Sequence, residues 1–342
     1  MQKRDLKNFS LGELREEVKN LGVEKYRADQ LFDFLYKKGK EDFTDMMTLP
    51  KSLTTLLQKY FYISKIGLKK VTKSKDQTKK YLFKLEDENL IESVLIFAGK
   101  RVTECISSQI GCKYNCLFCE SGKKGFTRNL TVSEILNQVL WVKKEIGTDL
   151  NNIVFMGIGE PLDNYDNVVK AIGILNSKDA FNIGARRITV STCGVIPAIK
   201  KLQERNWQIE LSVSLHAPEN KLRSYLMPVN NIYPLPDLIE TCKSYVKKTK
   251  RQITFEYLLI KGVNDTLNDA DKLARLIGGF NFKVNLISFN PTPDSLLQAS
   301  AIFQVKSFKD ELTAKGIPTT IRRSKGDDIS AACGQLKSLH LK

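Results

Sequence analysis

The feature that most restricts the fold is an alternation of short apolar runs with helical stretches between residues 102 and 322. Strands that alternate with helices build a parallel sheet, because each helix returns the chain to the edge where the next strand begins. The sequence therefore predicts an α/β fold whose sheet is either open or curled into a barrel. The predicted strands are Val102–Ser107, Asn152–Met156, Arg187–Thr192, Gln208–Ser214, Ile253–Ile260, Val284–Phe289 and Thr319–Arg322, and the predicted helices are Val132–Ile146, Val168–Leu175, Pro197–Gln203, Leu235–Val246 and Asp269–Leu276.

The residues before this region follow a different pattern. Apolar residues at helical spacing predict three short helices between residues 10 and 60, and the first of them begins after the capping residue Ser10 and ends at Gly22. Strands are predicted next at Phe61–Ile66, Lys80–Leu85 and Leu90–Phe97. We therefore expect a helical accessory domain at 1–60, connecting strands at 61–97 and a core at 98–336.

The composition indicates a polyanionic partner. The chain has 54 Lys and Arg against 38 Asp and Glu, a formal net charge of +16. A basic surface attracts nucleic acid because each neutralised phosphate releases counterions, although surplus charge can also serve solubility alone. No run of about twenty apolar residues is present, so no membrane span is predicted. The segment Met1–Lys7 lacks the apolar core of a signal peptide, and we expect a cytoplasmic protein.

Three cysteines form the strongest local motif. Seven cysteines are present, and an odd number in a cytoplasmic chain argues for metal binding or thiol chemistry rather than a disulfide framework. Cys112, Cys116 and Cys119 make a C-x3-C-x2-C run without an adjacent fourth ligand, which a structural zinc site would want. Three thiolates on a four-iron cluster instead leave one iron open. With Phe118 before the last cysteine, the motif resembles that of the radical SAM superfamily, in which the open iron chelates S-adenosylmethionine (SAM).

Small polar residues follow several predicted strands, at the end of the sheet where α/β folds bind ligands. Each has an ordinary structural explanation alone: Ser191 as a helix cap, His216 as a core histidine and Asn290 as a turn former. Their occurrence together with the cysteine motif favours SAM binding, and the turn Gly159-Glu-Pro161 resembles the superfamily motif that contacts the amino group of SAM. The predicted SAM contacts are Gly159, Glu160, Ser191, Ser214, Leu215, His216 and Asn290.

Longer stretches between about residues 10 and 336 resemble the RlmN/Cfr family of radical SAM RNA adenosine methyltransferases. The amino-terminal helices, with Tyr26–Gln30 and Thr48–Pro50, resemble the accessory RNA-binding domain of that family. The resemblance implies a partial (β/α)6 barrel, a [4Fe–4S] cluster and two molecules of SAM per methylation. The other matching stretches are Gly125–Thr131, Gly159–Pro161, Ser214–Ala217, Leu226–Pro228, Phe255–Tyr257, Gly262–Asp265 and Ile329–Leu336.

The resemblance also implies roles for residues outside the cluster motif. Cys333 matches the residue that a first SAM methylates and that carries the methyl group as a thioether. Cys105 matches the second catalytic cysteine, which helps release the product by forming a transient disulfide with Cys333. Glu92 matches the proposed proton acceptor, although a solvent-facing strand glutamate is its ordinary explanation. Cys193 and Cys242 match nothing catalytic and are expected to be packing thiols.

The implied substrates are an adenosine of 23S rRNA near the peptidyl-transferase centre and the adenosine 3′ of certain tRNA anticodons. The family divides into carbon-2 methylators and carbon-8 methylators that confer antibiotic resistance, and Gly159–Leu162 and Gly125–Leu130 resemble the carbon-2 branch. Glu120-Ser121 departs from it, because many relatives have Ala-Thr or Ser-Thr there. The implied electron donor is a flavodoxin- or ferredoxin-type reductase, and we expect a monomer. The alternative from another class is a zinc-stabilised RNA-binding protein without catalysis.

Overall fold

A computed structural model describes residues 3–291, 295–337 and 339–340. Its core is a curved sheet in which seven neighbouring strands run parallel, in the order β14-β13-β12-β11-β10-β9-β6. Within the described residues the full strand order runs from β14 to β3, so the sheet does not close into a complete barrel. The parallel strands are β6 (Arg101–Cys105), β9 (Asn152–Phe155), β10 (Ile188–Thr192), β11 (Glu210–Ser214), β12 (Ile253–Leu259), β13 (Phe282–Ser288) and β14 (Thr319–Arg322).

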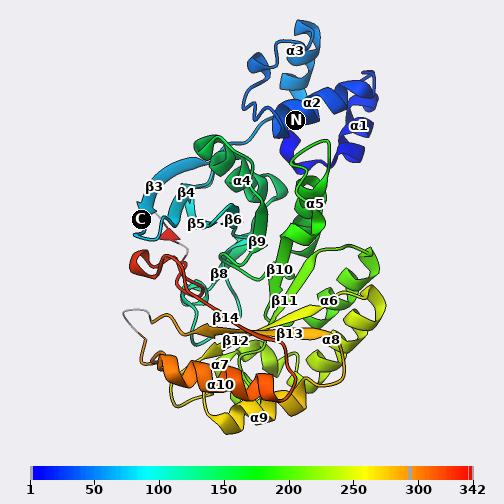
Figure 1. Ribbon diagram of the computed structural model, residues 1–342. Helices are drawn as coiled ribbons and strands as arrows, with labels where there is room; N and C mark the ends of the chain where they lie inside the picture. The colour runs from blue at the N-terminus through cyan, green and yellow to red at the C-terminus, as the bar shows by residue number, and fades with distance from the viewer. Residues whose placement is uncertain (1–2, 292–294, 338, 341–342) are drawn as a thin grey trace.

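A helical connection carries the chain from each parallel strand to the next, and Figure 1 shows these helices on the outer side of the sheet. The seven parallel strands are joined by six helical connections, and this arrangement confirms the predicted partial (β/α)6 barrel. The seventh strand, β14, follows the last helix. Periodicity did not predict α7 and α10, because α7 is short and α10 exposes Ile302 and Phe303. The helices are α4 (Val132–Ile146), α5 (Tyr165–Asn176), α6 (Ile196–Leu202), α7 (Asn220–Leu226), α8 (Leu235–Thr249), α9 (Leu267–Leu276) and α10 (Ile302–Ala314).

Three antiparallel strands extend the same sheet beyond β6. They are β3 (Gly67–Lys73), β4 (Lys79–Lys84) and β5 (Asn89–Ala98), and β5 pairs with β6 from Val94–Cys105 to Ala98–Arg101. The prediction of a strand at Phe61–Ile66 is wrong beyond Tyr62, and β3 was missed. The reason is that β3 is lysine-rich and almost wholly exposed, so it carries no apolar signal.

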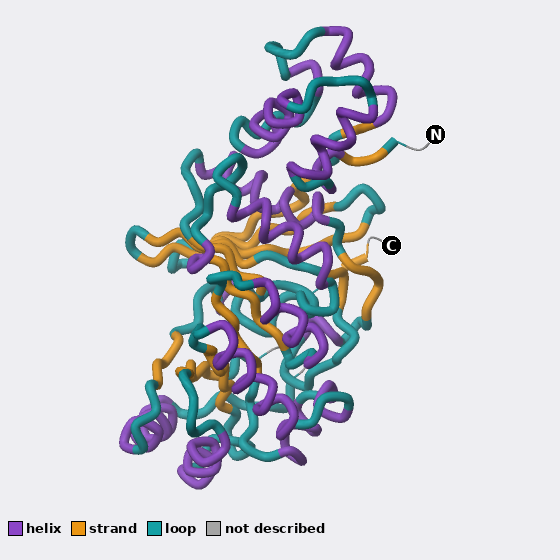
Figure 2. Tube along the Cα trace, turned by 90° about the vertical axis from the view of Figure 1, so that its right-hand side faces the viewer, coloured by secondary structure: helices purple, strands orange, loops and turns teal. Residues whose placement is uncertain are grey.

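The amino-terminal residues form the three predicted helices, α1 (Leu11–Asn20), α2 (Tyr26–Tyr36) and α3 (Lys51–Tyr60). Ser10 caps α1 as predicted, and the structure shows that it forms a capping box with Glu13. Figures 1 and 2 show these helices as a separate lobe at one end of the molecule. A short parallel pair, β1 (Arg4–Asp5) with β2 (Phe61–Tyr62), ties the two ends of this lobe together.

The lobe is joined to the core through α4. The side chain of Asn8 accepts a hydrogen bond from the Ser133 backbone at 2.9 Å, and the buried Lys7 donates to Asn137 at 2.6 Å. The lobe is therefore held against the outside of the barrel by specific polar contacts. Among the described residues, no helix combines the length and the apolar character needed to cross a membrane.

Candidate active site

The three motif cysteines lie on one loop after β6. The loop is enclosed by a short antiparallel pair, β7 (Gln109–Gly111) and β8 (Phe126–Asn129). The Leu117 backbone N–H donates to Leu226 at the end of α7 at 3.0 Å, and the Glu120 N–H donates to Gly334 at 2.7 Å. The loop is thus fixed both to the barrel and to the carboxyl-terminal segment. Cys112, Cys116 and Cys119 all line one cavity of about 160 Å³.

The donor set of this cavity fits a cluster better than a single zinc ion. The three motif thiols line the cavity together, and a tetrahedral zinc ion would need a fourth donor at about 2.0–2.3 Å. A four-iron cluster takes each thiolate on a different iron. Burial raises the pKa of all three thiols, that of Cys112 to about 12. The thiolate form therefore needs the positive charge of bound metal.

The turn after β9 places a carboxylate against the cavity. Glu160 is buried, its side chain accepts hydrogen bonds from the backbone N–H of Cys193 at 2.7 Å and of Leu162 at 3.0 Å, and it lines the cavity. Gly157 is required here, because a Cβ atom would lie 2.6 Å from the Ile106 backbone. Gly159 has φ of +100° and lines the cavity too. The turn therefore holds one carboxylate in a fixed position.

Ser191, Ser214 and His216 line the same cavity from the ends of β10 and β11. His216 is buried, and its Nδ1 accepts the Leu258 N–H at 3.0 Å. Burial and the neighbouring charge of Arg223 lower the pKa of His216 to about 3, so the ring is neutral. A neutral imidazole that accepts at Nδ1 carries its proton on Nε2. His216 can therefore donate one hydrogen bond from Nε2.

Two predicted SAM contacts lie elsewhere. The Leu215 side chain is fully buried and does not line the cavity, and its backbone N–H donates to Glu256 at 3.0 Å. Asn290 lines a second, larger cavity and donates from its side chain to the Cys333 carbonyl at 3.4 Å. In this structure Asn290 therefore supports the segment that carries Cys333.

The second cavity occupies the interior of the open barrel and has a volume of about 1050 Å³. Cys105, at the end of β6, is buried and lines the larger cavity but not the smaller one. Cys333 lines both cavities. Burial raises the pKa of Cys105 to about 12, and Cys333 raises it further while Arg322 opposes the shift. The two thiols are thus electrostatic neighbours at the point where the cavities meet.

Glu92 lies on β5 beside this region, on the same strand face as Val94 and Ile96, which line the larger cavity. Its side chain is buried, pairs with Lys80 at 3.0 Å and accepts the Lys337 N–H at 3.0 Å. The explanation as a solvent-facing strand glutamate is therefore wrong. Glu92 itself lines neither of these two cavities, and its carboxylate is held by the Lys337 backbone N–H instead.

Sequence reasoning missed four residues at the site. Cys193 lines the small cavity beside Glu160, whereas Cys242 is fully buried in the core as expected. Glu256 and Arg322 line both cavities. Arg223 contacts the ends of β10 and β11. The only available signal was their position in or beside matching stretches and strand ends, which does not distinguish a site residue from a core residue.

Comparison with known proteins agrees with this geometry. Residues 106–277 match the Radical SAM superfamily, and residues 4–63 match the family described as "Ribosomal RNA large subunit methyltransferase N-terminal domain". A protein of Clostridium novyi named "Probable dual-specificity RNA methyltransferase RlmN" is 44% identical over 340 residues, covering 99% of each chain. A Thermotoga maritima protein of the same name is 45% identical over 341 residues, again covering 99% of each.

A solved structure shows the same fold. The crystal structure of a radical SAM methyltransferase from Sphaerobacter thermophilus superposes with a TM-score of 0.92 at 43% identity, covering 97% of this chain and 99% of that one. The radical SAM family uses a [4Fe–4S] cluster with SAM, and RlmN uses SAM both as methyl donor and as radical initiator. The chain belongs to the RlmN family of radical SAM RNA methyltransferases.

Proposed function

We propose that this protein methylates carbon 2 of an adenosine in 23S rRNA, near the peptidyl-transferase centre, and of the adenosine 3′ of the anticodon in some tRNAs. The observation that carries the proposal is the position of Cys333, which lines both the cavity of the cluster motif and the barrel interior. A residue there can receive a methyl group on one side and present it to a base on the other. Cys105 lines the interior next to it.

The order of the covalent steps proposed here is the one that the resemblance to the RlmN/Cfr family implies. Bound cluster and SAM would supply a methyl group and, from a second SAM, a radical that removes a hydrogen atom. Cys333 accepts the methyl on its sulfur, loses one hydrogen atom from it and joins carbon 2 of adenine through the resulting methylene. This route suits an electrophilic ring carbon that has no lone pair for ordinary methyl transfer.

The adduct must then be released. Glu92 is the proposed acceptor of the ring proton, which requires the carboxyl-terminal segment around Lys337 to move away from it. The adduct loses this proton to Glu92 and one electron, for which the bound cluster would be the acceptor. The Cys105 thiolate then attacks the Cys333 sulfur and breaks its bond to the methylene carbon. The bonding electrons stay with that carbon, which takes a proton and becomes the methyl group. An electron-donor protein, for which we propose a flavodoxin or ferredoxin type, would feed the bound cluster with the electron for SAM cleavage, and two further electrons from a reductant return the Cys105–Cys333 disulfide to two thiols.

Glu160 is the proposed partner of the SAM amino group, and this role makes SAM binding pH-dependent. Burial raises the pKa of Glu160 to about 7, so the group is mostly charged at pH 8 and mostly protonated at pH 6. Only the carboxylate attracts an ammonium group, so SAM affinity should fall about tenfold between pH 8 and pH 6. Equilibrium dialysis of the anaerobically purified protein measures this. Glu160→Gln should bind about 10- to 100-fold more weakly with a flat profile, and a wild-type profile without slope would contradict the role.

The barrel interior has the charge expected of an RNA channel. Its lining contains eight basic side chains against the acidic Glu210 and Glu256. Phosphate groups would be attracted to this opening, and an unstacked adenine could enter the interior. The basic residues are Arg101, Arg186, Lys250, Arg251, Lys283, Arg322, Arg323 and Lys325.

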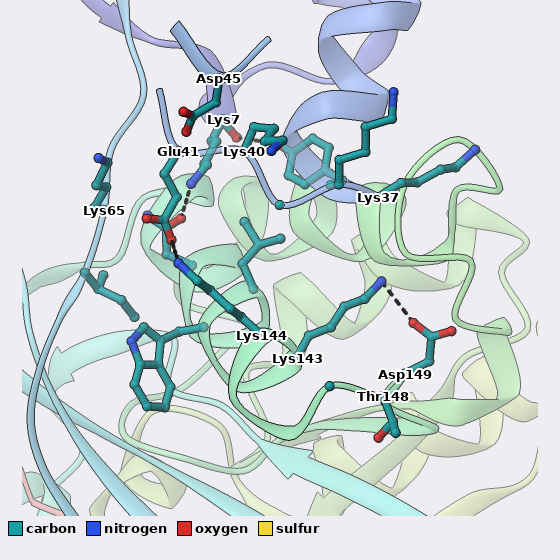
Figure 3. Close-up of a pocket in the computed structure, with 18 residues that line it drawn as sticks. Lys7, Lys37, Lys40, Glu41, Asp45, Lys65, Lys143, Lys144, Thr148 and Asp149 are labelled. Atoms are coloured by element: carbon teal, nitrogen blue, oxygen red, sulfur yellow. Dashed lines mark hydrogen bonds and ion pairs between the residues drawn. The ribbon is translucent and has the colours of Figure 1, made fainter. Parts of the chain in front are cut away.

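A second basic groove lies between the amino-terminal lobe and α4 (Figure 3). It has a volume of about 520 Å³, and lysines from both parts of the chain surround it together with Glu41, Asp45 and Asp149. Lys144 pairs with Glu41 at 3.3 Å and Lys143 with Asp149 at 2.9 Å. We propose that this accessory groove holds the RNA backbone outside the active site. Its lysines are Lys7, Lys37, Lys38, Lys40, Lys65, Lys143 and Lys144.

The accessory groove gives a charge test. Lys40 and Lys65 carry none of the ion pairs named above, so Lys40→Gln/Lys65→Gln should weaken binding of a folded rRNA fragment and reduce the slope of log affinity against log salt by about 0.7–0.9 per lost contact. Fluorescence anisotropy at several salt concentrations measures both values. The matched control is Lys247→Gln/Lys306→Gln, which removes equal charge from exposed positions on α8 and α10. Equal losses in both double variants would contradict the groove.

The decisive test of the proposed function is nucleoside analysis. Digested rRNA and tRNA from cells with and without this gene should differ by 2-methyladenosine in mass spectrometry. A carbon-8 product would assign the protein to the other branch of the family. A purified protein that is colourless and holds one zinc would support the non-catalytic alternative.

A further inference from the structure

A buried arginine lies next to the cluster loop and has no carboxylate partner among the described residues. Arg223 on α7 is fully buried. Charge buried without an opposite charge is costly, and proteins normally pair it. Here the guanidinium donates to four neutral oxygen atoms, and no carboxylate of the described residues forms an ion pair with it. The negative charge that compensates Arg223 therefore has to come from a group other than a carboxylate of the described residues.

The thiols of the site supply the nearest candidates for negative charge. Arg223 donates to the Cys193 carbonyl at 2.6 Å, and Cys193 lines the same cavity as the motif cysteine Cys116. The connection is also mechanical, because the Leu117 N–H donates to Leu226, one turn along the same helix. Three thiolates on a [4Fe–4S]2+ core leave a net negative charge. Arg223 is therefore placed where a cluster would complete the charge balance.

The same guanidinium holds the strand ends that line the small cavity. It donates to the carbonyl of Cys193 after β10 at 2.6 Å and to those of Ser214 and Leu215 at the end of β11 at 3.0 and 3.3 Å. A fourth bond reaches the Asn230 side chain at 2.9 Å. The Cys193 N–H in turn holds Glu160. Arg223 thus joins the cluster loop to both strand ends proposed to contact SAM.

We propose that Arg223 is a positioning residue that provides the buried counter-charge of the cluster and fixes the strand ends at the SAM cavity. Reduction adds one electron to an already negative site, and a fixed cation in a low-dielectric interior stabilises that added charge. Arg223 therefore raises the reduction potential of the cluster. This proposal concerns the cluster alone and does not depend on which carbon or which RNA is methylated.

The test is a potentiometric titration of the anaerobically purified full chain, followed by electron paramagnetic resonance. Arg223→Met removes the charge and should lower the reduction potential by at least 59 mV, which is a tenfold change in the one-electron equilibrium. Arg223→Lys keeps the charge but cannot reach all four acceptors. It should keep the potential within 59 mV of wild type while weakening SAM binding about tenfold.

Lys113→Gln is the matched control. It also removes one positive charge, from the residue next to Cys112, but Lys113 is half-exposed and paired with Asp163 at 2.9 Å. Solvent screens such a charge, so the potential should not change. Arg223→Met with normal iron content and the wild-type potential would overturn the proposal. If Arg223→Met does not accumulate as folded protein, Arg223→Lys decides alone. A potential within 59 mV of wild type together with SAM binding weakened about tenfold supports the proposal, and wild-type SAM binding or a fall of 59 mV or more overturns it.

Discussion

Replacing any one of Cys112, Cys116 and Cys119 with alanine is expected to remove both the brown chromophore and the formation of 5′-deoxyadenosine. The three thiols line one cavity, and three thiolates are the minimum that leaves a single iron open for SAM. Loss of one ligand should therefore abolish SAM cleavage rather than reduce it. Iron and sulfide analysis, the visible spectrum and chromatography of the cleavage products measure the effect.

The control for this experiment is Cys242→Ala. Cys242 is a fully buried cysteine on α8, and it lines neither cavity. Its replacement should cost about 1 kcal/mol of stability through lost packing and leave about four irons per chain. Normal iron content in any of the three motif variants would contradict the assignment of the cluster ligands.

Much of the barrel could be predicted because most of its parallel strands bury at least one face and are rich in apolar residues. β12, for example, is buried at every residue, and five of its seven residues are apolar or aromatic, with Thr254 and Glu256 between them. The exposed β3 could not be predicted in this way, since its side chains contact solvent and carry no periodic signal. The sequence also did not predict that β5 pairs with β6, because this pairing is a contact between backbones that no local sequence pattern encodes.

The candidate site was predictable where residues form a local motif. The cysteine loop, the turn at Glu160 and His216 line the same cavity, as their positions after strands suggested. Arg223 and Arg322 could not be found, because their importance comes from burial beside thiols that are distant in the sequence. The burial of Glu92 could not be predicted for the same reason, because its partner Lys337 is distant in the sequence.

The two proposed catalytic cysteines should give opposite phenotypes, although both line the barrel interior. Cys333→Ala should assemble the cluster but never become methylated, so no methyl carbon reaches the RNA. Cys105→Ala should still methylate Cys333 and attack the adenine, and then stall because no thiolate is present to break the carbon–sulfur bond. The stalled species joins protein and RNA through a methylene bridge. It should appear on a denaturing gel as a nuclease-sensitive band of reduced mobility.

Isotope labelling tests the same route independently of any variant. With SAM that carries three deuterium atoms on its methyl group, removal of one hydrogen atom from the Cys333 methyl leaves a methylene with two deuterium atoms. The released product then gains its third hydrogen from the ring or from solvent, so mass spectrometry should find two deuterium atoms in the RNA methyl group. Direct transfer from SAM to the base would keep all three. Retention of three would rule out the methylene route and, with it, the proposed roles of both cysteines.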